Sequence, residues 1–157
     1  MRFYTLYPSP VGPICITGDS DHILRLDFAV PAPEAVRRDD LPVLRQTCRW
    51  LDAYFAGQAP DPDMIPTRLE GSPFQKAVWT ILQTIPYGQS LTYGTIAKQL
   101  SPTMSAQAVG GAVGKNPISI LVPCHRVLGA GTRITGYAGG LDKKRYLLEL
   151  EGIPYRE

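Results

Sequence analysis

Apolar and polar positions alternate at the start of the chain, with the period of two that is typical of β-strands. The alternation covers residues 3–7, a second apolar run covers residues 14–17, and a third covers residues 23–28. Residues 8–13 and 18–21, which separate these runs, are rich in proline, glycine and aspartate. Short apolar runs bounded by turn-forming residues are typical of strands joined by hairpins. The pattern therefore predicts a small antiparallel sheet.

Beyond residue 40 the apolar positions change to helical spacing. Leu44, Cys48, Leu51 and Phe55 lie three or four residues apart, and a glycine follows them closely. This spacing places all four on one face of a helix, and glycine commonly ends one. The pattern predicts a helix over residues 41–55.

The next segment, residues 59–68, contains three prolines and predicts a linker. We therefore divide the chain into an N-terminal subdomain with its linker, residues 1–68, and a C-terminal domain, residues 69–157. A helix is expected to begin at Ser72 and Pro73, because serine is a favourable N-cap and proline suits the first helical position.

Two short helices are predicted over residues 92–100 and 105–113, and the second is rich in alanine and glycine. Such a pair suggests a helix-turn-helix, although small residues suit close approach to DNA and packing against another helix equally well. A last helix is predicted over residues 141–151. The chain thus has a predicted α+β fold: a small N-terminal antiparallel sheet with a helix, then a helical C-terminal domain with a (winged) helix-turn-helix.

Composition narrows the class of protein. Hydrophobic residues make up 44% of the 157, enough for a core. The longest apolar run, residues 118–122, is too short to span a bilayer, and the N-terminus has no apolar segment of the kind found in secretory signals. The three cysteines show no C-x-x-C spacing, so zinc is not expected and a reducing cytoplasm fits best. We expect a cytoplasmic protein with no membrane partner.

Charge is distributed unevenly along the chain. Residues 1–70 carry a formal charge of −3 and residues 71–157 carry +5, within a total of +2. A basic half suits a polyanionic partner such as DNA, and it is equally typical of an ordinary solvated surface.

The chemistry-bearing segment is the pentapeptide Pro-Cys-His-Arg-Val at residues 123–127. A thiol becomes a strong nucleophile when a base takes its proton, and His125 adjoins Cys124. Side chains at successive strand positions point apart, so the pair needs a turn or a relay through water. Either Glu149 or Glu151, on the predicted last helix, could orient the imidazole, and spacing alone does not choose between them.

Four segments of the C-terminal domain resemble the O6-alkylguanine-DNA alkyltransferase family in motif and in order. They are GSPFQKAVW at residues 71–79, IPYGQSLTYGTIA at 85–97, AVGGAVGKNPISILVPCHRV at 108–127 and GYAGGLDKKRYLLELEG at 136–152. The N-terminal part resembles the family's smaller subdomain only loosely. The resemblance implies a DNA repair protein that flips a damaged guanine out of the duplex and transfers the O6-alkyl group irreversibly to its own cysteine.

The resemblance also implies a role for each matching catalytic residue. Cys124 would accept the alkyl group, His125 would act as its base through a bridging water, and Glu151 would hold the imidazole. Asn116 would bond to the backbone between the recognition helix and the active site. Tyr93 would crowd the target phosphate and reach the base edge. No metal and no cofactor is implied.

Six further residues are implied in binding the flipped base or the DNA: Gln107, Ala108, Arg126, Val127, Tyr137 and Ala138. The family usually has an intercalating arginine at the position of Gln107, so slower flipping or weaker binding is expected. Some relatives have serine at the position of Ala138, where a backbone N–H would remain as a donor.

The expected partner is double-stranded DNA that contains O6-alkylguanine, bound by a monomer. O4-alkylthymine as a second substrate and cooperative binding to DNA are left open.

Three other classes of protein make different demands on the sequence. An alkyltransferase-like lesion-binding protein usually has tryptophan in place of the acceptor cysteine. A cysteine hydrolase would need an oxyanion hole or a helix N-terminus at the nucleophile, and a cysteine-sensing transcription regulator would need a further domain.

Overall fold

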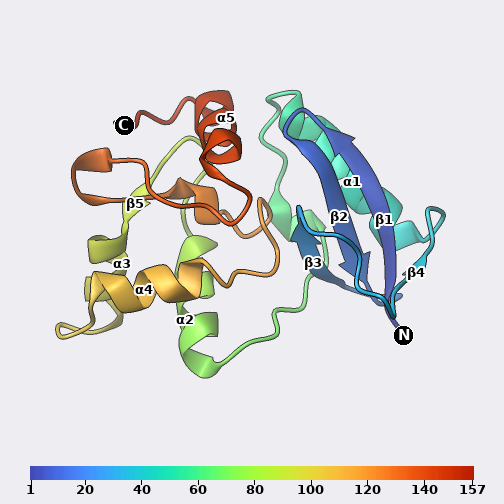
Figure 1. Ribbon diagram of the computed structural model, residues 1–157, viewed down its shortest axis with the longest axis horizontal. Coiled ribbons are helices and arrows are strands. Elements are labelled where there is room, and N and C mark those ends of the chain that lie inside the picture. Colours follow the sequence, from blue (N-terminus) through green and yellow to red (C-terminus); the bar gives the residue numbers. More distant parts are fainter. The chain divides into compact units, whose positions relative to one another are not determined.

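A computed structural model describes residues 1–157, which form two compact units, Met1–Glu70 and Gly71–Glu157 (Figure 1). The first unit contains a four-stranded sheet and a long helix. The second is mainly helical and contains only a two-stranded sheet. The α+β fold is confirmed, with the sheet-bearing part first.

The sheet of the first unit has the strand order β3-β2-β1-β4. Strands β1 (Phe3–Ser9), β2 (Gly12–Gly18) and β3 (Ile23–Asp27) are antiparallel neighbours, as expected. The fourth strand, β4 (Val36–Arg37), pairs parallel to β1 and makes the sheet mixed. Its two residues are exposed and too few to show a periodic pattern, so this strand could not be predicted from the sequence.

Helix α1 (Pro42–Phe55) packs against β1 and β2. Leu44 and Leu51, which the helical spacing placed on one face, are both fully buried. The proline-rich segment that follows is attached to this unit rather than extended as an open linker. It contains the short 3₁₀ helix η1 (Pro62–Met64), and its Pro66 carbonyl accepts a 2.8 Å hydrogen bond from the Ile23 N–H of β3.

The second unit begins with helix α2 (Pro73–Leu82), and Ser72 is its N-cap as expected. The hydroxyl of Ser72 accepts from the N–H of Gln75, whose side chain in turn accepts from the Ser72 N–H, a reciprocal capping box. The buried face of α2 includes Trp79, whose indole N–H donates to the Ala112 carbonyl at 2.9 Å.

Helices α3 (Tyr93–Leu100) and α4 (Ala106–Val113) pack against each other across a tight turn and form the expected pair. Thr92 and Ser105 cap their N-termini through side-chain oxygens. The two-stranded sheet of this unit joins β5 (Leu91–Thr92) in parallel to β6 (Val127–Leu128). No antiparallel wing hairpin accompanies the helices, in contrast to the winged form considered from sequence.

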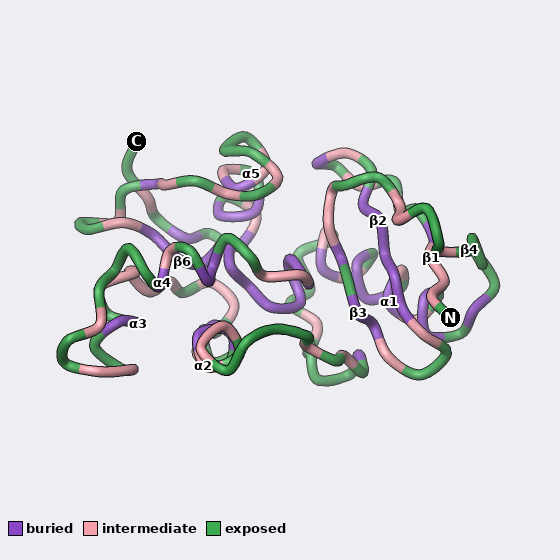
Figure 2. Tube along the Cα trace, turned by 60° about the horizontal axis from the view of Figure 1, so that its bottom comes forward, coloured by how far each residue is buried: buried purple, intermediate pink, exposed green.

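Between α4 and β6 the chain runs through the interior, and residues 118–128 are all buried (Figure 2). The apolar run at residues 118–122 is thus buried, but it does not form an extended strand. Ile120 has a φ of 71°, and the Val122 N–H donates back to the Ile118 carbonyl at 3.0 Å, which closes a tight turn. A β-branched residue rarely adopts positive φ, so nothing in the apolar run indicated this turn.

The chain then forms the 3₁₀ helices η2 (Cys124–Arg126) and η3 (Ala130–Thr132) and the last helix, α5 (Leu141–Glu151). Helix α5 packs against η2. The buried face of α5 carries Leu147 and Leu148 together with Lys144 and Glu151. No helix of the protein is long and apolar enough to cross a membrane.

Candidate active site

Cys124 lies at the first position of η2, is buried, and lines a pocket of about 330 Å³. The parallel pairing of β5 with β6 brings the start of α3 beside this segment, because Leu91 lies opposite Val127. The pocket is therefore built from segments that are far apart in the sequence. Its lining residues are Tyr93, Gly110, Val113, Gly114, Asn116, Ser119, Cys124, Gly136, Tyr137 and Ala138.

The surroundings of Cys124 keep its side chain a thiol at rest. Burial raises the pKa of Cys124 above its usual value, while hydrogen bonds from the side chains of Asn116 and Ser119 and the charge of Lys144 oppose that rise. A buried thiol with a raised pKa is a poor nucleophile at neutral pH. Reaction at this sulfur therefore requires a base.

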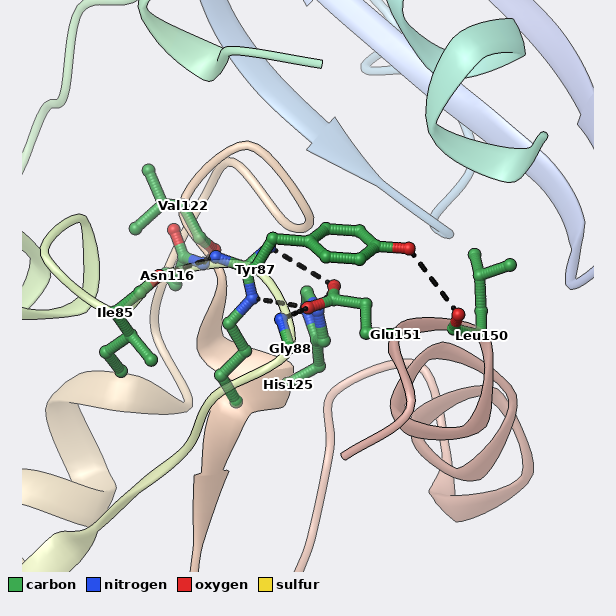
Figure 3. Close-up of polar contacts among 9 residues, drawn as sticks. Ile85, Tyr87, Gly88, Asn116, Val122, His125, Leu150 and Glu151 are labelled. Carbon is green, nitrogen blue, oxygen red and sulfur yellow. Dashed lines mark hydrogen bonds and ion pairs between the residues drawn. The ribbon is translucent and has the colours of Figure 1, made fainter. Parts of the chain in front are cut away.

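His125, the residue after Cys124, forms a buried pair with Glu151 (Figure 3). His125 Nε2 lies 2.5 Å from Glu151 Oε2, and neither side chain is exposed to solvent. Burial lowers the pKa of His125, despite the opposing effect of Glu151, so the imidazole is neutral at pH 7. With its Nε2 proton donated to a carboxylate, a neutral imidazole carries its basic lone pair on Nδ1.

Glu151 is ionised and held by several donors. Burial raises the pKa of this carboxyl, but hydrogen bonds and charges from His125 and Arg126 outweigh it and lower the pKa to about 2. The Gly88 N–H also donates to Glu151 Oε1, at 3.1 Å (Figure 3). Gly88 has a φ of +83°, a conformation open to glycine, in the turn that aims this N–H at the carboxylate.

Arg126 has a different place from the one expected of a residue that contacts substrate or DNA. Its Nε and Nη2 donate to the two oxygens of Glu151 at 2.8 and 3.2 Å, and its Nη1 donates to the Ile85 carbonyl at 2.6 Å. The guanidinium also lies 5.7 Å from the centre of the Tyr87 ring. The side chain is buried and engaged within the protein, because the 3₁₀ turn of η2 directs it toward α5.

Asn116 lies between α4 and the nucleophile. Its amide donates to the Val122 carbonyl at 2.8 Å (Figure 3), and its side-chain oxygen accepts from the Ile118 N–H at 3.0 Å. These bonds satisfy backbone groups of the buried turn and attach the end of α4 to the segment that leads into Cys124.

The remaining residues named from sequence fall into two groups. Tyr93, Tyr137 and Ala138 line the pocket with Cys124, and the hydroxyl of Tyr93 accepts a 3.0 Å hydrogen bond from Thr135. Val127 is fully buried beside the pocket, in β6. In contrast, Gln107 and Ala108 are exposed on the first turn of α4 and are not part of the pocket lining.

Two residues of the site were missed from sequence, although each left a signal. Ser119 is the one polar residue in the apolar run at 118–122, and it is buried in the pocket wall. Lys144 lies seven residues before Glu151, which places the two on the same face of α5, and it is fully buried. Each of the two polar residues stands at a position where the surrounding pattern is apolar, and this signal could have identified both.

Fold and site together define a class of protein in which a buried cysteine, followed by a histidine that is paired with a carboxylate, shares a domain with a helix-turn-helix. Comparison with known families agrees. Residues 2–69 match the 6-O-methylguanine DNA methyltransferase ribonuclease-like domain, and residues 73–153 match the 6-O-methylguanine DNA methyltransferase DNA-binding domain.

Individual relatives are similar over nearly the whole chain. The methylated-DNA–protein-cysteine methyltransferase of Haemophilus influenzae is 45% identical, over 98% of this chain and 88% of its own length. That of Methanosarcina acetivorans is 43% identical, over 96% and 98%. The crystal structure of Mycobacterium tuberculosis OGT in complex with DNA has a TM-score of 0.89 at 40% identity, covering 96% of this chain and 92% of that one. The chain belongs to the 6-O-methylguanine DNA methyltransferase family.

Proposed function

We propose that this protein repairs DNA by transferring an alkyl group, typically methyl, from O6 of guanine to the sulfur of Cys124. The observation that carries the proposal is the buried Cys124 thiol in a pocket of about 330 Å³, followed directly in the chain by His125, which is paired with Glu151. A pocket of this size suits a single base, and an alkylated base reaches a buried thiol only after it leaves the duplex.

Transfer begins with the thiol proton. The neutral imidazole of His125 takes it through a bridging water, and the ionised Glu151 stabilises the imidazolium that results. The thiolate attacks the alkyl carbon, so a carbon–sulfur bond forms while the bond from that carbon to O6 breaks. The electron pair of the broken bond leaves on guanine, and the proton held by His125 balances that negative charge.

The helix-turn-helix supplies the DNA-binding surface. Exposed Gln107 and Ala108 lie at the start of α4, where a recognition helix contacts a groove. We assign Gln107 to the space left by the flipped base and Tyr93 to the target phosphate and base edge. The carbonyls of Cys124 and Val127 would accept hydrogen bonds from the guanine amino group, and the Ala138 N–H would donate one to the guanine oxygen. Tyr137 would form a wall of the pocket.

The product is a thioether, which offers no simple route back to a thiol, so each molecule acts once. The reaction as written needs no metal and no cofactor. We further propose that the protein acts as a monomer on double-stranded DNA. Three free cysteines fit the reducing cytoplasm as its location.

The direct test is to incubate the protein with a duplex that contains one O6-methylguanine and to measure the mass of the intact protein. We expect one added methyl group per molecule, located on Cys124 by peptide mapping, and no addition in Cys124→Ser. Methylation of Cys15 or Cys48 would contradict the assignment. Tight binding to the damaged duplex without any mass change would identify a lesion-binding protein instead.

A further inference from the structure

Lys144 is a lysine in the interior of the second unit. It lies on the face of α5 that packs toward η2, and its side chain is 0% exposed. Its ammonium donates to the Val127 carbonyl at 2.7 Å, to the Thr135 carbonyl at 3.0 Å and, more weakly, to the Gly136 carbonyl at 3.5 Å. Lysine is almost never fully buried unless it is paired with a charge, so this position requires an explanation.

The hydrogen-bond partners of Lys144 are all neutral backbone oxygens. Glu151, the buried carboxylate on the same face of α5, is bonded to His125 and Arg126 instead. Carbonyl dipoles solvate an ammonium but do not cancel its charge. The region around Cys124 therefore contains one buried positive charge that no protein carboxylate balances.

The three carbonyls belong to the segments that bound the substrate pocket. Val127 follows η2, which carries the nucleophile, and Thr135 and Gly136 lead to Tyr137 in the pocket wall. The ammonium thus joins the segment that carries Cys124 to the segment that carries Tyr137. The charge of Lys144 also favours the thiolate form of Cys124, because it opposes the rise that burial causes in the pKa of this thiol.

We propose that Lys144 supplies the fixed positive charge that offsets the negative charge moving from the Cys124 sulfur to the departing guanine. The inference rests on the proposed function. The thiolate, the transition state and the guanine anion each carry one negative charge within the same buried pocket, where electrostatic interactions are only weakly screened. A fixed ammonium stabilises all three, and its carbonyl contacts hold it in place before substrate arrives. Lys144 donates no proton in the reaction.

The pH dependence of such a site involves every ionisable group near the ammonium. These groups are Cys124, His125 and Arg126 on η2, Tyr93 on α3, Tyr137 in the pocket wall and Glu151 on α5. Burial lowers the pKa of Lys144 itself to about 8, so the side chain is mostly charged at neutral pH. The side chain therefore loses its charge within the pH range over which the reaction rates can be measured.

The test compares Lys144→Met and Lys144→Gln with Lys143→Met. Methionine removes the charge and the donors, glutamine removes the charge but keeps a donor for the carbonyls, and Lys143→Met removes the adjacent charge of the same helix. Two rates are measured: single-turnover methyl transfer from an O6-methylguanine duplex, and alkylation of Cys124 by iodoacetamide without DNA between pH 6 and 10. Thermal unfolding checks that each variant is folded.

We expect both Lys144 variants to transfer methyl about 100-fold more slowly at pH 7.5, a typical effect of removing one preorganised electrostatic group. At pH 7, where Lys144 is mostly charged, alkylation by iodoacetamide should be about tenfold slower in both variants, because a nearby positive charge that favoured the thiolate is gone, and the difference should shrink above pH 8 as the wild-type lysine loses its charge. Lys143→Met should match the wild-type protein in both rates.

Wild-type rates in Lys144→Gln would overturn the proposal, since they would mean that the donor matters and the charge does not. Equal alkylation rates at pH 7 in the wild-type protein and in both variants would overturn it as well. If Lys144→Met does not fold, Lys144→Gln carries the comparison. Failure of the wild-type protein to accept methyl on Cys124 would refute the proposed function instead, and the alkylation profile would still report on Lys144.

Discussion

At the scale of single residues, Glu151 connects the parts of the site. It accepts from His125 and Arg126 of η2 and from the Gly88 N–H at the same time, so it joins two distant segments of the chain. Both carboxylate oxygens therefore accept hydrogen bonds, and Glu151 fixes the tautomer and the position of the His125 imidazole. A buried carboxylate with so many donors is sensitive to any change of charge or geometry.

Replacing Glu151 with glutamine should reduce the rate of methyl transfer by about 100-fold to 10,000-fold, because an amide can present its NH₂ to His125 and favour the wrong tautomer. Single-turnover transfer from an O6-methylguanine duplex measures the loss. Glu149→Gln is the matched control, because Glu149 is exposed on the same helix and contacts Tyr155. Equal rates in the two variants would show that Glu151 does not orient the base.

The sequence predicted these residues unevenly, for physical reasons. The sequence identified the Cys124–His125 pair, because a thiol nucleophile needs a base and the two residues are adjacent in the chain. Glu149 and Glu151 were equivalent by spacing, and only the packing of α5 against η2 buries the second. The sequence did not predict the contact of Arg126 with Glu151, because the direction of the arginine side chain depends on a 3₁₀ turn that the motif does not encode.

At the scale of elements, local signals fixed the helices well and the irregular segments poorly. Ser72 and Pro73 marked the start of α2, because capping and proline geometry act within a few residues. The turn at Ile120 and the parallel strand β4 depend on contacts distant in sequence, so the apolar pattern did not reveal them. The coupling of α4 to the nucleophile through Asn116 is likewise a tertiary feature, which here was expected from the family motif rather than from periodicity.

Helix α4 carries the testable departure from the family pattern. Gln107→Arg should raise the rate of methyl transfer from duplex DNA by about tenfold, because a longer, charged side chain at this exposed position can fill the space of the flipped base and contact phosphate. The rate on the same lesion in single-stranded DNA should change much less. Gln99→Arg, which adds the same charge at an exposed position of α3, controls for general attraction to DNA. An equal gain from Gln99→Arg would mean that position 107 has no specific part in flipping.

At the scale of the whole molecule, the division into two units separates the charges and the chemistry. The acidic half coincides with the first unit, and the basic half, with every residue of the candidate site, coincides with the second. The charge difference was readable from the sequence and favours DNA as the partner of the second unit. The burial of His125, Arg126, Lys144 and Glu151 in that unit was not readable, since it follows from how α5 and η2 pack.

That burial predicts that acid destabilises the second unit more than the first. The pKa of Glu151 is about 2 in the folded protein against an ordinary value of 4.5. Its contribution is therefore complete above pH 4.5 and is lost as the pH falls toward 2, by about 3 kcal/mol in total. The lowered pKa of His125 acts in the same direction, because the unfolded chain takes up that proton first as the pH falls below 6.5.

Each unit contains one buried tryptophan that can report this difference. Trp50 lies on α1 of the first unit and Trp79 on α2 of the second. We expect urea unfolding followed by Trp79 fluorescence, in Trp50→Phe, to shift to much lower urea between pH 7 and pH 3. The transition followed by Trp50, in Trp79→Phe, should shift less, because no buried ion pair of this kind lies in its unit. Parallel shifts of both transitions would instead show that the two units unfold as one cooperative body, so that the loss in the second is shared by the whole chain.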